Sequence, residues 1–167
     1  ADGTTLAIGA HRANNPAGTA DTGHVRVYKY NPNKVTEVID QSSNSFGPVG
    51  WDRLGRDIDG ETLDDQSGWS VALSADGTVV AIGAYENSGN GTNSGHVRIY
   101  VWNGTSWVKR GNDIDGEAAG DRSGISVSIS ADGSIVLIGA SYNDGNGIDV
   151  AEHPEYKVWI PELIFGH

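Results

Sequence analysis

The sequence predicts an all-β fold made of about three four-stranded antiparallel units. Three observations lead to this prediction: a long internal repeat, short apolar segments separated by tight turns within each copy, and no segment of useful length with helical periodicity. The chain also carries 24 glycines among its 167 residues. Self-similarity at a fixed period is typical of repeat architectures, in which each copy folds into one supersecondary unit.

The repeat is clearest between residues 51–91 and 107–147, which align at a shift of 107 − 51 = 56 residues and are identical at more than half of the positions. A partial copy opens the chain, where residues 7–10 repeat residues 81–84. The whole chain is therefore expected to form a single repeat domain. Its units are expected at about residues 1–50, 51–106 and 107–167.

Each unit is predicted to contain four strands. Residues 70–74 alternate, with Val71 and Leu73 on one face. The Ala-Asp-Gly turn that follows leads into residues 78–84, a largely buried strand. Residues 97–102 form a third strand, and Asn103-Gly104 is a hairpin signal before the fourth strand, residues 106–109. Four antiparallel strands with a long connection to the next copy are the make-up of a propeller blade.

Three units are too few for a closed ring, since propellers have about 4–8 blades. The sequence therefore predicts an incomplete propeller, completed either by a homo-oligomer or by the remainder of a longer chain. Unpaired strand edges at both ends would otherwise invite aggregation. Residues 150–167 leave the repeat pattern and are expected to supply a strand to the first unit, which lacks its opening strand.

Composition excludes several classes of function. The chain has 11 basic and 22 acidic residues and a net charge of −11, so a nucleic-acid partner is not expected. It has no apolar run of about 18 residues, so no membrane span is expected. It has no cysteine, which excludes disulfides and thiolate metal sites. Because it begins at Ala1, it is expected to be a processed or excised segment.

Two segments carry a resemblance to a known family. Residues 120–127 (GDRSGISV) and 138–140 (IGA) resemble FG-GAP repeats, which form β-propellers in integrin α-chains and in secreted microbial proteins. The resemblance covers about residues 1–150 and is strongest to the microbial branch. It implies an extracellular location and a protein or carbohydrate ligand. Ser67 and Ser123 replace the phenylalanine of the family motif, which weakens any transfer of integrin-type ligand binding.

An acidic loop that occurs twice is the main candidate site. Carboxylates two positions apart in an extended loop point to one side, and Ca²⁺ takes 6–8 oxygen ligands. FG-GAP proteins commonly bind Ca²⁺ in such loops, and the resemblance carries this role to the matching positions. The alternative is that the carboxylates accept backbone N–H bonds and shape the turn between blades. The candidate metal ligands are Asp57, Asp59, Glu61 and Asp65 in the first loop and Asp113, Asp115, Glu117 and Asp121 in the second.

Other polar and aromatic positions have two interpretations each. Residues 87–93 and 143–149 are either sugar-binding loops or flexible connections, and the second is favoured. Trp107 and the other tryptophans either pack between blades or stack on sugars. His24 and His96 occupy equivalent positions of the repeat, which favours a structural role because catalysis needs one special copy.

The sequence thus predicts a non-enzymatic extracellular binding or adhesion module, with Ca²⁺ in the loops between blades. One alternative is a lectin with a sugar pocket in each blade. A second is a fragment of a larger propeller enzyme, which is disfavoured because no catalytic motif stands out.

Overall fold

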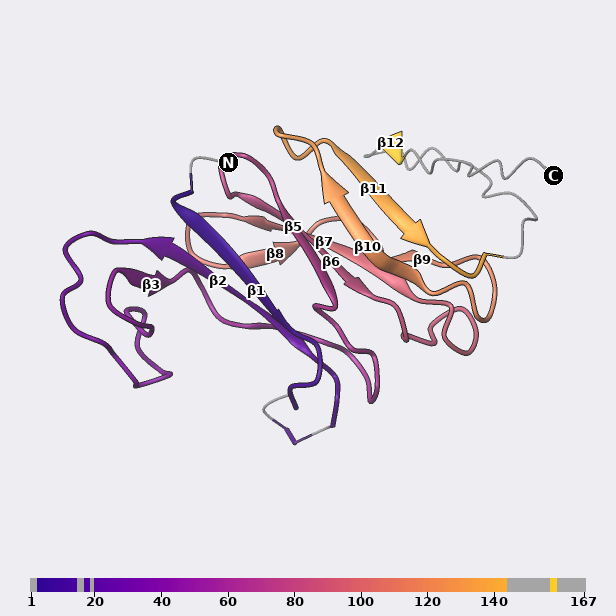
Figure 1. Cartoon of the computed structure of the whole chain (residues 1–167), viewed down its shortest axis with the longest axis horizontal. Helices are drawn as coiled ribbons and strands as arrows, with labels where there is room; N and C mark the ends of the chain where they lie inside the picture. The colour runs from indigo at the N-terminus through magenta and orange to yellow at the C-terminus, as the bar shows by residue number, and fades with distance from the viewer. Residues whose placement is uncertain (1–2, 15–16, 19, 144–156, 159–167) are drawn as a thin grey trace.

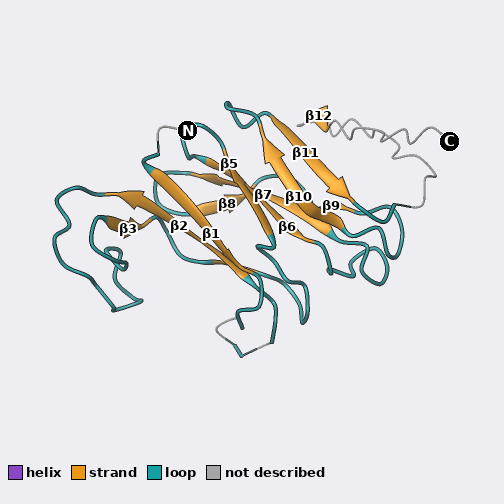
Figure 2. Ribbon diagram, in the orientation of Figure 1, coloured by secondary structure: helices purple, strands orange, loops and turns teal. Residues whose placement is uncertain are grey.

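The structure is a computed structural model that describes residues 3–14, 17–18, 20–143 and the backbone of residues 157–158. The described residues contain strands and turns and no helix. The strands form three open sheets that lie side by side in chain order (Figures 1 and 2). The predicted all-β fold of incomplete propeller blades is confirmed.

The first sheet, here called blade 1, is built on a long hairpin. β1 (Thr5–Ala10) pairs antiparallel with β2 (His24–Tyr30), and β2 pairs on its other edge with two short segments, β3 (Trp51–Arg53) and β4 (Ile58–Asp59). Residues 31–50 fold back between β2 and β3. Blade 1 therefore has no counterpart of the opening strand of the next sheet among the described residues.

The second sheet, blade 2, is the complete unit. It runs in the order β5 (Ser70–Leu73), β6 (Val79–Ala84), β7 (His96–Trp102) and β8 (Trp107–Lys109), all antiparallel. β9 (Ile114–Asp115) pairs with β7 just as β4 pairs with β2. The four predicted strands of this unit are all present, with a short fifth segment in the loop that follows.

The third sheet, blade 3, contains β10 (Ser123–Ile129) and β11 (Ile135–Ala140) as an antiparallel hairpin. β12 (Lys157–Val158) pairs parallel with β11. These two residues of the C-terminal segment thus join blade 3 and not the first unit. The rest of that segment lies outside the described residues.

The sheets and the repeat copies are out of phase. The copy that starts at Trp51 contributes its first nine residues to blade 1, because β3 and β4 both pair with β2. The copy that starts at Trp107 likewise contributes β8 and β9 to blade 2. A repeat can be cut at any point of its period, so the sequence frame and the sheet boundaries need not coincide.

The core lies between the blades, in two layers on either side of β6. Successive side chains of a strand point to opposite faces, so Val80 and Ile82 pack toward blade 1 while Val79 and Ala81 pack toward blade 3. All six residues of β6 are buried. The layer shared with blade 1 also contains Val25, Val27 and Ile58, and the layer shared with blade 3 also contains Val97, Ile99, Val136 and Ile138.

Candidate functional site

Two equivalent acidic loops, residues 57–66 and 113–122, connect the blades. The first loop is anchored by its backbone, because Gly60 N–H donates to the carbonyl of Gly23 (2.8 Å) and Ser67 N–H donates to the carbonyl of Thr22 (2.9 Å). The second loop repeats both bonds at equal length, from Gly116 to Gly95 and from Ser123 to Ser94. The two loops therefore occupy equivalent places beside β2 and β7.

Asp65 shapes the turn of the first loop. Its side chain is buried, and its Oδ2 accepts the backbone N–H groups of Glu61 (3.1 Å) and Thr62 (2.8 Å). Its Oδ1 accepts the Thr62 hydroxyl (2.6 Å) and the side-chain amide of Asn87 (2.9 Å). Asp121 is buried as well and accepts the backbone N–H three residues before it. The turn-shaping interpretation therefore describes both residues.

Asp57 forms an ion pair with a strand of its own blade. Arg26 on β2 donates Nε–H to Oδ1 (2.7 Å) and Nη2–H to Oδ2 (2.5 Å), which is the bidentate geometry that favours Arg–carboxylate pairs. Burial raises the pKa of Asp57, but the hydrogen bonds and charge of Arg26 outweigh it and lower the pKa overall. The equivalent Asp113 instead lies 2.6 Å from Lys109 Nζ.

The remaining candidate carboxylates have separate surroundings. Glu61 is exposed and lies 3.1 Å from Arg98 Nη1. Burial and the neighbouring charge of Asp57 raise the pKa of Asp59. Asp115 is exposed and lies 3.9 Å from the ring of His96, and Glu117 is exposed in the second loop.

The four candidate carboxylates of one loop therefore do not converge on one point. In the first loop, Asp65 is occupied by backbone and side-chain donors and Asp57 by an arginine. A Ca²⁺ ion needs 6–8 oxygens around it, and the loops do not present such a set as they stand. The predicted calcium role stays a prediction. Asp57, Glu61 and Asp113 lie in ion pairs, and Asp65 and Asp121 accept hydrogen bonds from the backbone.

One group with metal-ligand chemistry joins the two loops. Glu61 of the first loop, Asp113 of the second loop and His96 of β7 each offer a ligand atom within 4.8 Å of the others. Among the described residues, this is the cluster of three acidic or histidine side chains close enough to hold one ion. The sequence predicted a structural role for His96. The only sequence signal for the cluster is that this histidine recurs in the repeat beside an acidic loop.

His96 is buried, with 2% of its surface exposed. Burial lowers the pKa of its imidazole below the ordinary 6.5, and the positive charge of Arg98 lowers it further. The nearby carboxylates oppose this shift only in part. Its Nε2 atom is buried and has no hydrogen-bond partner among the described residues.

Arg98 connects blade 2 to the first loop. Its Nη2 donates to the backbone carbonyl of Asp59 (2.9 Å) and to the hydroxyl of Ser67 (3.3 Å). The equivalent Arg26 pairs with Asp57, in the loop that follows its own blade. The same arginine of the repeat thus binds the loop before its blade in blade 2 and the loop after its blade in blade 1.

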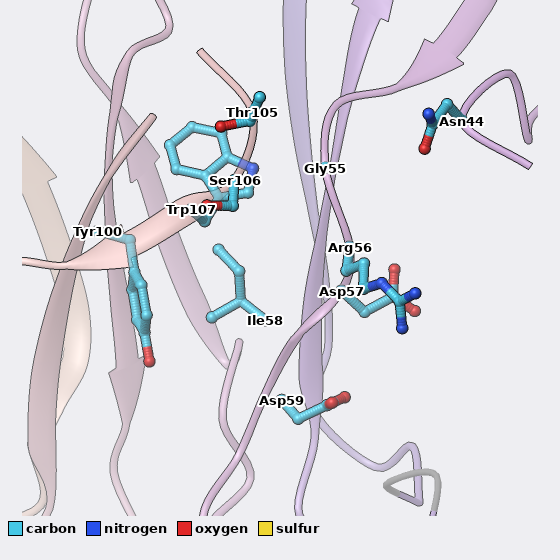
Figure 3. Close-up of a pocket in the computed structure, with 10 residues that line it drawn as sticks. All are labelled: Asn44, Gly55, Arg56, Asp57, Ile58, Asp59, Tyr100, Thr105, Ser106 and Trp107. Carbon is cyan, nitrogen blue, oxygen red and sulfur yellow. The ribbon is translucent and has the colours of Figure 1, made fainter. Parts of the chain in front are cut away.

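A pocket of about 460 Å³ opens between blades 1 and 2 (Figure 3). Tyr100 and Trp107 of blade 2 form one wall, and the strand segment with Asp57 and Asp59 forms the other. The indole N–H of Trp107 donates to the carbonyl of Leu54 (2.8 Å), which holds the ring between the blades. The pocket thus combines aromatic rings with a few polar groups, which is the make-up of many small-molecule sites.

The comparisons with known proteins support the resemblance. Residues 57–100 match the FG-GAP repeat family. This segment begins in the first acidic loop, contains β5 and β6, and ends within β7. No curated protein matches the chain. Within the described residues, no helix is long and apolar enough to cross a membrane.

Proposed function

We propose that this chain, which contains an FG-GAP repeat and is built of propeller-type blades, is a non-enzymatic extracellular binding module whose two end faces pack against further blades. One observation supports the proposed packing of the end faces: equivalent residues of the repeat are buried in the middle blade and exposed in the end blades. The covered faces of blade 2 therefore show what the equivalent faces of blades 1 and 3 would contact in a longer array.

The free face of blade 1 lies on β1. Leu6 and Ile8 are 41% and 47% exposed. Their equivalents in blade 2, Val80 and Ile82, are both 0% exposed because blade 1 covers them. Large apolar side chains in a row on a sheet face are a typical mark of an interaction surface.

The free face of blade 3 lies on β11. Ile135 and Leu137 are 42% and 43% exposed, whereas their equivalents Val79 and Ala81 are 5% and 0% exposed under blade 3. Gly139 completes this row and corresponds to Gly83, on which the backbone of the next blade packs closely. The face that blade 3 presents therefore has the pattern that accepts a following blade.

The two faces are complementary: the β1 face of blade 1 matches the face that packs on a preceding blade, and the β11 face of blade 3 matches the face that packs on a following blade. Contacts between unlike faces generate a ring when the rotation closes. For the chain alone, the occupant we propose is a second copy, because two copies of three blades reach the range of about 4–8 blades found in closed propellers. In a longer protein, flanking blades of the same repeat would take that place.

Light scattering over a range of concentrations tests the second-copy proposal. The wild-type chain is expected to have the mass of a dimer, and Leu137→Lys is expected to shift it to the monomer. Leu63→Lys is the matched control, because Leu63 is 58% exposed in the first acidic loop and not on a blade face. A wild-type chain that stays monomeric at every concentration would reject the second copy as the occupant.

A lectin is the second candidate, and the pocket between blades 1 and 2 favours it. Tyr100 and Trp107 offer ring surface, and Asp59 and Ser106 offer polar atoms at the same opening. A glycan array is the test, with Asp59→Asn as the variant expected to lose the signal while its far-ultraviolet spectrum stays unchanged. No binding to any glycan would count against this candidate and leave a protein ligand as the partner.

Calcium binding in the acidic loops is part of this proposal. Several carboxylates of the two loops have protein partners. Any Ca²⁺ would have to displace these partners or use the exposed Glu117 and Asp115. Thermal melting with added CaCl₂ and with EDTA is the test. A melting temperature that is equal under both conditions would remove calcium from the proposal and leave the binding module intact.

A further inference from the structure

The meeting of Glu61, His96 and Asp113 joins three separate parts of the chain. Glu61 comes from the loop before blade 2, Asp113 from the loop after it, and His96 from β7 of the blade itself. Their ligand atoms lie within 4.8 Å of one another, so small side-chain movements would bring all three to the ~2.0–2.2 Å at which Zn²⁺ is bound. We propose that these three residues bind a divalent transition metal ion of the Zn²⁺ type.

The buried imidazole is the observation that points to a ligand. His96 is only 2% exposed, and its Nε2 is enclosed without a hydrogen-bond partner among the described residues. A buried polar atom normally has a partner, so an atom without one calls for an explanation. The imidazole stands beside two carboxylates that reach the surface, with Glu61 at 43% and Asp113 at 22% side-chain exposure. An ion could therefore reach the group from solvent.

The donor set selects the type of metal. Zn²⁺ is bound by histidine nitrogen and carboxylate oxygen in four-coordinate sites, and three protein ligands leave one position for water. Ca²⁺ and Mg²⁺ prefer oxygen donors and do not favour imidazole. One imidazole with two carboxylates thus fits a transition metal. The proposal is therefore separate from the calcium prediction and does not depend on closure of the propeller.

The repeat explains why the site occurs at blade 2. A complete set needs an acid from the loop before the blade and another from the loop after it. Blade 1 carries the equivalent His24 and Asp57, but no acidic loop precedes this blade among the described residues, and Asp57 is held by Arg26. His24 therefore serves as an internal control with the same place in the repeat and no complete set of ligands.

Two basic side chains compete with the ion. Arg98 Nη1 lies 3.1 Å from Glu61 Oε1, and Lys109 Nζ lies 2.6 Å from Asp113 Oδ1. Each carboxylate has a second oxygen for a metal. Lys109 is on the exposed strand β8 and can move away, so metal binding is expected to replace the Lys109–Asp113 ion pair. Removing the lysine charge should then strengthen binding.

Titration with ZnCl₂ by calorimetry and with CoCl₂ by visible absorption tests the site in the full chain. The expected result is one ion per chain and a cobalt spectrum with the features of nitrogen and oxygen ligands. His96→Gln and Glu61→Gln are each expected to weaken binding by more than about tenfold. Lys109→Met is expected to strengthen it, and His24→Gln is expected to bind as the wild type does.

Two separate variants, His96→Gln and Glu61→Gln, keep the test informative even if one of them fails to fold. Glu61 is exposed, so Glu61→Gln is expected to keep the wild-type circular dichroism even where His96→Gln disturbs the core. Absence of zinc and cobalt binding by the wild-type chain would overturn the proposal. Binding that survives both His96→Gln and Glu61→Gln would overturn it too, because the ion would then sit elsewhere.

Discussion

The backbone of Gly68, at the start of blade 2, packs directly on Gly9 of β1. A Cβ atom built on Gly9 would lie 1.9 Å from the carbonyl oxygen of Gly68. The next pair of blades repeats the contact, with 2.1 Å between a Cβ built on Gly83 and the carbonyl oxygen of Gly124. Neighbouring blades thus approach each other at backbone distance, which only glycine allows.

Gly83→Ala is expected to destabilise the fold by about 3 kcal/mol, because the obstructing atom is backbone and the blades must move apart. Urea unfolding at low protein concentration, where no second copy covers blade 3, measures the loss by tryptophan fluorescence. Gly139→Ala is the matched control at the same position of the repeat. Its Cβ would first meet the hydroxyl of Ser126, which can rotate away, so a smaller loss is expected. Equal losses in both variants would contradict the close approach of blades 2 and 3.

Ile82→Ala is expected to cost about 2–5 kcal/mol of unfolding free energy, as for other fully buried aliphatic residues. The equivalent Ile8→Ala is expected to cost much less in the isolated chain, because Ile8 is 47% exposed. Chemical denaturation of the two variants at low protein concentration gives the comparison. A large loss for Ile8→Ala under those conditions would mean that another part of the chain covers blade 1.

Asp64 has a left-handed backbone conformation (φ 63°), and its equivalent in the second loop is Gly120 (φ 90°). Left-handed conformations are unfavourable for residues with a Cβ. Asp64→Gly is therefore expected to stabilise the chain by about 0.5 kcal/mol, and Gly120→Asp to destabilise it by about the same amount. A Cβ at Gly120 would meet no atom within 4 Å, so steric overlap does not contribute to the change. Shifts of equal sign in thermal melting would refute this explanation.

His96 makes stability depend on pH in the weakly acidic range. Its pKa is lower in the folded chain than the ordinary 6.5, because burial and the charge of Arg98 disfavour the imidazolium. The unfolded chain therefore binds more protons below pH 6.5. The stability is fully present above that pH and falls as the pH drops toward the folded pKa. The carboxylates that oppose the shift are Asp113, Asp65 and Glu61.

Melting temperatures measured between pH 7.5 and 5.5 check this dependence. The wild-type chain is expected to lose stability across the range, and His96→Gln is expected to flatten the profile. His24→Gln is expected to keep the wild-type slope. A slope that is unchanged in His96→Gln would assign the dependence to another group.

The strand content could be predicted because it depends on local pattern. The alternation in residues 70–74, the Ala-Asp-Gly turn and the apolar residues 78–84 correspond to β5, a hairpin turn and β6. The turn has a local cause that the sequence displays, since Asp76 accepts bonds from the Ser74 hydroxyl and from Thr78. The repeat shows that the glycines at blade contacts recur, but it does not show that they contact another blade. The atom that leaves no room for a Cβ belongs to that next blade.

The candidate site was predictable only in part. The eight acidic residues were identifiable as a duplicated set, and the turn-shaping alternative describes Asp65 and Asp121. Their partners were not identifiable from spacing. Arg26 lies 31 residues from Asp57, and Arg98 turns to the loop before its blade while Arg26 turns to the loop after. Such contacts depend on how each loop packs against its neighbouring strand.

The amino-acid sequence by itself determined the repeat, the strands and turns within each copy, and the acidic character of the connecting loops, because these follow from the order of residues over short distances. Tertiary structure alone decided which face of each blade is covered and which is open. It also decided that Glu61, His96 and Asp113 meet. These features depend on residues brought together by packing of separate sheets, and a linear pattern does not contain that packing.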